Sequence, residues 1–102
     1  MIIIKDMVYE MEEELEKAKW YYEDALALKE THPEFARKYI EIAKQELNHL
    51  AIIHDMVVAY VNKLKSDGKE MTDYMKKEYE RAHIKLIDEK MELDYKINRF
   101  SI

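Results

Sequence analysis

The chain contains no cysteine, one glycine and one proline among its 102 residues. The absence of cysteine excludes disulfide bonds and thiolate metal sites, and it is compatible with a reducing compartment. One glycine cannot build the glycine-rich loops that hold phosphate groups. Because turn-forming residues are scarce while 48% of the residues are hydrophobic, we expect a few long helices in a single all-α domain covering residues 1–102.

Charge and the lack of long hydrophobic runs exclude two classes of partner. The net charge of −5 gives no support for binding to nucleic acid. The N-terminal segment reaches Lys5 and Asp6 after only a few apolar residues, so it is too short for a signal peptide or a membrane span. We therefore expect a soluble, cytoplasmic protein with neither nucleic acid nor a membrane as partner.

Two turn signals divide the chain into three predicted helices. In segment 31–34, a proline that follows a threonine and precedes a glutamate is typical of a helix start. Segment 66–69 contains the only glycine, for which a positive φ costs least. The predicted helices cover about residues 5–30, 33–65 and 70–100. Such lengths suit a long antiparallel hairpin plus a third helix, or a bundle that a partner chain completes.

Apolar residues recur at helical spacing in the first two predicted helices, and two glutamates interrupt them. The apolar positions are Met7, Met11, Ala18, Tyr21, Ala25 and Leu28, then Ala36, Tyr39, Ala43, Leu50, Ile53, Val57, Tyr60 and Leu64. Glu14 and Glu46 occupy positions within these stripes, and His49 lies one turn after Glu46. Two carboxylates that face each other in an apolar seam repel and hold a proton unless a cation lies between them. A bound divalent metal is the simplest interpretation, and a hydrogen-bonded polar cluster is the alternative.

The Glu-x-x-His motif is weak evidence by itself. With four histidines and 15 glutamates in 102 residues, chance predicts about 0.6 matches. Two occur, Glu46/His49 and Glu80/His83. Because basic residues surround Glu80 along the helix, the second pair is interpreted as an exposed helix face. Position on the apolar stripe therefore favours the first pair as a metal site.

The remaining two histidines have simpler interpretations. His54 lies between apolar positions of the second predicted helix, so we expect it to pack in the core or at an interface. His32 precedes the proline at a predicted turn, and we expect it to be exposed.

Two segments resemble encapsulated ferritins. Residues 13–21 read Glu-Glu-Leu-Glu-Lys-Ala-Lys-Trp-Tyr, which is similar to the first helix of that family, and residues 45–49 resemble its second-helix Glu-x-x-His. The matching span, about residues 13–61, is roughly half of the chain. The resemblance implies a ferritin-like four-helix bundle completed by dimerisation, with a di-iron ferroxidase centre between two subunits. The matched residues are Glu14, Glu46 and His49 as metal ligands and catalytic residues, Glu13 and Glu16 as secondary cation-attracting residues, and Trp20 and Tyr21 as the aromatic pair beside the centre.

Ligand number gives a separate argument for a homodimer or a higher homo-oligomer. A complete carboxylate di-metal centre needs about four Glu and two His, and one chain offers half of that set. The ligand types suit iron, manganese or zinc without choosing among them, and the resemblance implies iron. The third predicted helix runs almost to the end of the sequence without a targeting tail, which argues against an encapsulin shell as partner. The alternative function is a non-enzymatic structural or adaptor bundle, of phage origin, that binds another protein.

Overall fold

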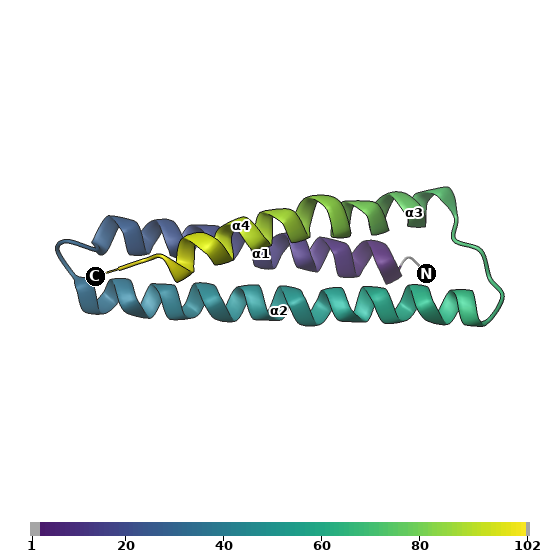
Figure 1. The fold of residues 1–102 in the computed structure, drawn as a ribbon, viewed down its shortest axis with the longest axis horizontal. Helices are drawn as coiled ribbons and strands as arrows, with labels where there is room; N and C mark the ends of the chain where they lie inside the picture. The colour runs from purple at the N-terminus through teal and green to yellow at the C-terminus, as the bar shows by residue number, and fades with distance from the viewer. Residues whose placement is uncertain (1–2, 102) are drawn as a thin grey trace.

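Residues 3–101 are described by the structure, a computed structural model, and they form helices without strands. The elements are α1 (Ile3–Leu28), α2 (Pro33–Ser66), α3 (Asp73–Glu80), the π-helical segment η1 (Arg81–Leu86) and α4 (Ile87–Asn98). α1 and α2 form an antiparallel hairpin, and α3, η1 and α4 together make a third helix that returns along it (Figure 1). The prediction of an all-α chain with three helices, two of them long, is confirmed.

The turn between α1 and α2 follows the proline signal. Pro33 occupies the first turn of α2, and the backbone N–H of His32 donates to the carbonyl of Leu28 at 2.8 Å. The preceding hydroxyl does not cap the helix, because the Thr31 side chain is hydrogen-bonded to the His32 ring at 2.9 Å. The helix start is therefore set by the restricted φ of the proline rather than by a side-chain cap.

The turn after α2 requires its glycine. Gly68 has φ +71°, a left-handed conformation, and the backbone N–H of Lys69 closes the helix end on the carbonyl of Leu64 at 2.9 Å. The third helix begins at Asp73 rather than near residue 70 as predicted. Its start is fixed by Thr72, whose hydroxyl accepts a hydrogen bond from the backbone N–H of Met75 at 3.1 Å.

The third helix is continuous through its π-helical segment, since Glu80 and Leu86 at the two junctions have right-handed helical φ and ψ. It is joined to α1 by Lys19–Glu89 at 2.9 Å and by an ion pair between Arg81 and Glu12. A π-helical turn holds one more residue than an α-helical turn, so it changes which residues face inward.

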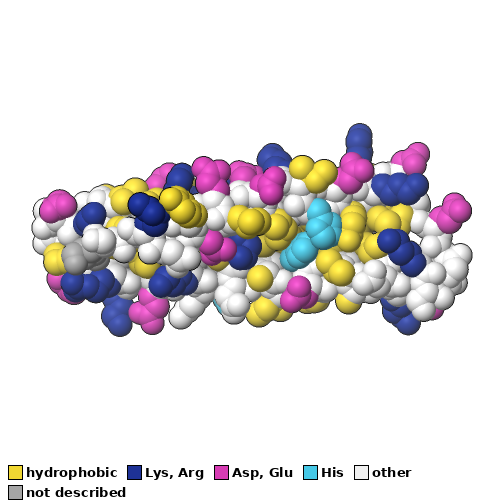
Figure 2. Space-filling model, viewed as in Figure 1, with side chains coloured by type: hydrophobic (Ala, Val, Ile, Leu, Met, Phe, Trp, Pro, Cys, Tyr) yellow, Lys and Arg dark blue, Asp and Glu magenta, His cyan; other side chains and the backbone are white. Residues whose placement is uncertain are grey.

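The core runs along the length of a molecule that measures 56 × 22 × 17 Å. Four fully buried alanines belong to the predicted stripes: Ala18, Ala25, Ala36 and Ala43. Small side chains allow helices to approach closely. Among the described helices, none is long and apolar enough to cross a lipid bilayer. Acidic and basic side chains are interspersed over the face shown in Figure 2.

One side of the hairpin is not covered by the third helix. Glu12 and Lys19 contact the third helix, whereas Glu14 and Tyr21 each come two residues later, about 200° around α1. The residues of this open face of the hairpin are Glu14 and Tyr21 on α1, and Phe35, Tyr39, Ile42, Glu46, His49, Ile53 and Met56 on α2. The α2 residues follow strict 4–3 spacing, yet Phe35 is 55% exposed and Met56 is 53% exposed. The open face is therefore a largely apolar surface in the single chain.

Candidate metal centre

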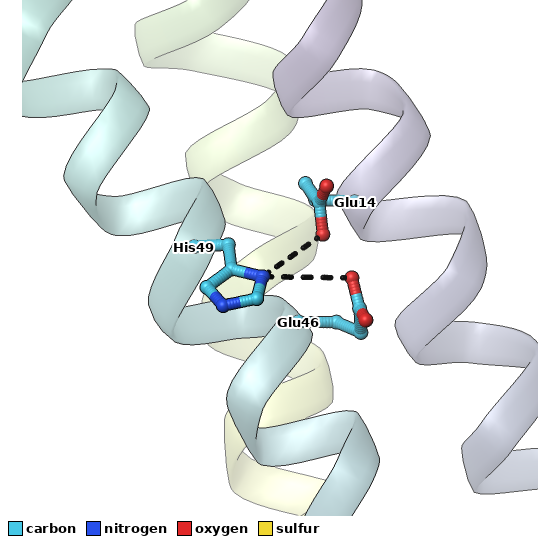
Figure 3. A group of neighbouring side chains, drawn as sticks. All are labelled: Glu14, Glu46 and His49. Atoms are coloured by element: carbon cyan, nitrogen blue, oxygen red, sulfur yellow. Dashed lines mark ion pairs between the residues drawn. The ribbon is translucent and has the colours of Figure 1, made fainter.

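Glu14, Glu46 and His49 converge at the middle of the open face. α1 supplies Glu14, and α2 supplies Glu46 and His49 one turn apart (Figure 3). The Nδ1 atom of His49 lies 3.5 Å from Oε2 of Glu14 and 3.9 Å from Oε2 of Glu46. One ligand atom from each residue lies within 4.8 Å of the other two. The structure thus brings together the three residues that the sequence selected as metal ligands.

The two carboxylates are shielded from solvent, while the imidazole is not. The side chains of Glu14 and Glu46 are 17% and 16% exposed, against 55% for His49. Within residues 3–101, the inner Oε2 atoms of both glutamates are buried, and neither has a hydrogen-bond partner while both groups are ionised. A buried acceptor without a partner costs about 1–3 kcal/mol. The Lys17 ammonium lies 3.9 Å from the other oxygen of Glu14, Oε1. It therefore does not compensate the negative charge at the two inner oxygens.

The proximity of the carboxylates raises the pKa of Glu46. The hydrogen bond that protonated Glu46 would make with Glu14 is the largest cause, followed by burial and the negative charge of Glu14, while Lys17 and His49 oppose the shift. The metal-free pair therefore holds a shared proton more readily than an isolated glutamate does. A divalent cation beside the same oxygens would replace that proton. Two carboxylates and an imidazole suit iron, manganese or zinc.

The two acidic residues expected to attract cations, Glu13 and Glu16, are not members of the Glu14/Glu46/His49 group. Glu13 and Glu16 are exposed. Glu13 accepts a hydrogen bond from Tyr9, which together with the negative charge of Glu13 raises the pKa of that phenol. Glu16 lines a shallow pocket with Lys19 and Lys85, on the third-helix side of α1. Within one chain, Glu16 therefore lies away from the centre.

The two residues of the aromatic pair, Trp20 and Tyr21, differ in their surroundings. Trp20 is 59% exposed and points to solvent in the single chain. Tyr21 is half-buried, and its ring stacks on that of Tyr39 with centroids 5.9 Å apart and planes at 20°. Tyr21 therefore belongs to the open face, one heptad after Glu14 and two heptads after Met7 in the same row.

The second Glu-x-x-His does not form a cluster of its own. Glu80 is exposed, as predicted, whereas His83 is half-buried and turned toward α2. There it meets His54, with Nδ1 of His83 3.3 Å from Nε2 of His54. The sequence did not predict this pair, because the contact depends on how the third helix packs against the hairpin. His32 is exposed, as predicted, and stacks on Phe35.

Comparisons of the chain with protein-family models, with curated proteins and with solved structures found no match in any of the three.

Proposed function

We propose that two copies of this chain pack through their open faces and join two Glu14/Glu46/His49 groups into a di-metal centre that oxidises Fe(II). The observation that carries the proposal is the convergence of three metal-ligating side chains around two buried carboxylate oxygens without a partner. A bound cation would supply the positive charge that these oxygens lack. Burial of these oxygens destabilises the metal-free fold, and a bound cation would offset that destabilisation.

The incomplete ligand set and the apolar open face support a second copy as the missing part. Three ligand side chains leave a di-metal centre half built. They lie among exposed apolar residues such as Phe35 and Met56, which a partner hairpin would cover. A two-fold axis through the centre brings the same patch from each chain together and doubles the ligands. The four helices of two hairpins would then form a ferritin-like bundle.

Each ligand has a definable part in the proposed reaction. Two Fe(II) ions are the substrate, and each gives one electron to dioxygen. Glu14 and Glu46 hold the ions, and Glu46 gives up the shared proton on binding, because its raised pKa keeps that proton available near the site. His49 contributes the lone pair of Nδ1, the ring nitrogen that faces both glutamates. Its half-exposed ring also lies at the surface where the partner copy would pack.

The test is metal content combined with oxygen-dependent oxidation. After anaerobic loading with Fe(II), we expect about one ion per chain, a dimer by light scattering, and Fe(III) absorbance on admission of air. Glu46→Gln and His49→Gln should each abolish stoichiometric loading. Glu41→Gln is the matched control, because Glu41 is exposed on the same helix and pairs with Lys38. A native chain that loads no stoichiometric iron, or that stays monomeric at micromolar concentration, contradicts the proposal.

The open face also supports the alternative function of a non-enzymatic adaptor. An amphipathic helical face that exposes Phe35 and Met56 is suited to a different protein as well as to a second copy. The two functions differ in their dependence on metal. An adaptor would remain monomeric and bind its partner equally well after Glu46→Gln, whereas the proposed centre would lose its metal.

A further inference from the structure

A second pair of side chains that could ligate a metal lies outside the open face. His54 on α2 and His83 on η1 meet across the junction between the hairpin and the third helix. Their ring centroids are 4.6 Å apart, with planes at 84°. Figure 2 shows histidine side chains at the surface, near the middle of the face where the third helix and α2 lie side by side. Solvent therefore reaches this part of the junction.

We propose that His54 and His83 form a mononuclear site for a divalent first-row transition metal, such as Zn(II) or Cu(II), that joins α2 to the π-helical segment of the third helix. The proposal is independent of the Fe(II) chemistry, because it uses none of the open-face residues. The remaining coordination positions would be filled by water from the exposed side.

The spacing of the facing nitrogens fits two ligands of one ion. Nε2 of His54 and Nδ1 of His83 are 3.3 Å apart. Two nitrogens bound to a tetrahedral Zn(II) at about 2.0–2.1 Å lie about 3.3–3.4 Å from each other. The junction therefore already has the ligand separation that such an ion requires, without movement of either helix.

A hydrogen bond between the rings leaves the pair incompletely satisfied. Whichever ring donates, Nε2 of His83 stays buried without a partner among residues 3–101. It is not one of the two facing nitrogens, so an ion bound between the rings would leave it without a partner as well. The ring is nevertheless held firmly, because Tyr79 packs edge-on against it at 4.3 Å between centroids. The pair is thus better described as two oriented imidazoles than as a finished hydrogen-bond network.

The charges around the pair favour a cation. Asp55, next to His54, is negative, and the positive charge of Arg81 is paired with Glu12 and Glu78. Burial, and then the charge of His83, lowers the pKa of His54, so at neutral pH its ring keeps a free lone pair. Neutral imidazole binds transition metals well and binds Mg(II) poorly. The π-helical geometry of residues 81–86 agrees with this role, because such segments are frequent at functional sites.

The experiment uses the full chain with Glu14→Gln and Glu46→Gln, which removes the open-face carboxylates. Calorimetric titration with Zn(II) and with Cu(II) should show one ion per chain, and Mg(II) should show none. Adding His54→Gln or His83→Gln should weaken binding at least tenfold. His32→Gln is the matched control and should change nothing, because His32 is exposed at the α1–α2 turn.

Two further measurements separate ligation from an effect on folding. Cu(II) paramagnetic resonance should show coupling to two imidazoles in the background protein and to one in either variant, while circular dichroism reports that each variant remains helical. Zn(II) should raise the melting temperature of the background by several degrees and of neither variant. Equal affinity in the background and in both histidine variants, or an equal loss in His32→Gln, would overturn the proposal. Its failure would leave Fe(II) loading of the native chain unaffected.

Discussion

The two histidine-containing regions differ in how they are built. The centre on the open face uses two long helices that are neighbours in sequence, and its residues repeat with the helical period of α1 and α2. The His54/His83 pair depends on how the third helix lies against the hairpin and on a π-helical turn within it. Carboxylates dominate the first region and imidazoles the second. The two proposals therefore assign harder cations to the first region and softer ones to the second.

The two regions share the buried core around Leu50, and substitution of this residue tests how much both depend on it. Leu50 is fully buried and lies one helical turn from both Glu46 and His54. Leu50→Ala should lower the free energy of unfolding by about 2–5 kcal/mol, because it removes packed atoms and leaves a cavity. Chemical denaturation measures the loss, and metal titrations should show both regions weakened. A loss below about 1 kcal/mol would mean that the core relaxes around the site and that the two regions are less rigidly connected than their packing indicates.

Glu46→Gln separates the regions by metal content. It should abolish iron loading at the open face, while Zn(II) binding by the histidine pair persists. In the metal-free protein the same substitution should not destabilise the fold at neutral pH. The raised pKa of Glu46 means that the folded state favours the proton, so stability is fully present below the unfolded pKa and is lost as pH rises through the folded pKa. Glutamine mimics the protonated form and removes that loss.

Urea denaturation of the metal-free native chain and of Glu46→Gln, each from pH 4 to pH 8, measures the effect of Glu46. The stability of the native chain should fall relative to that of the variant as pH rises. Parallel curves would show that the two carboxylates do not share a proton.

The histidine pair should respond to pH in the opposite direction. The pKa of His54 is lowered by burial and by the charge of His83. Its contribution to stability is therefore present above the unfolded pKa, about 6.5, and is lost as pH falls below it. Metal-free native protein should lose stability over that range, and His54→Gln should lose less. Thermal melts from pH 8 to pH 5 give the measurement, with His32→Gln as the control. Equal acid sensitivity in the native chain and in His54→Gln would show that the junction is not the pH-sensitive element.

Local periodicity predicted the hairpin and the convergence of Glu14, Glu46 and His49, because those residues lie on stripes that two adjacent helices bury together. The turn at Gly68 was predictable for a similar reason, since a single residue determines the conformation. The His54/His83 contact was not predictable from one sequence, because it depends on which side of the hairpin the third helix packs against. His83 also lies within the π-helical segment 81–86, whose wider turn is not contained in a regular 3.6-residue pattern. The family, the oligomer, the metal, cytoplasmic localisation and the absence of an encapsulin partner stay predictions.

The smallest effect is expected at Lys17, and it concerns only the open face. The Lys17 ammonium lies 3.9 Å from Oε1 of Glu14, and its side chain is 47% exposed. A metal ion entering the centre competes with this positive charge, so Lys17→Met should raise the affinity for Mn(II) or Fe(II). An exposed ion pair is worth about 0.2–1 kcal/mol, which corresponds to roughly a 1.5- to 5-fold increase at low salt and less at high salt.

Anaerobic calorimetry at two salt concentrations measures the effect of Lys17→Met, and Lys44→Met, an exposed lysine of α2, is the matched control. The Zn(II) affinity of the His54/His83 pair should not change, because Lys17 is paired with Glu14 and the two histidines are paired with each other. An increase in metal affinity that Lys44→Met reproduces would show that net charge, and not this particular ammonium, controls binding at the open face.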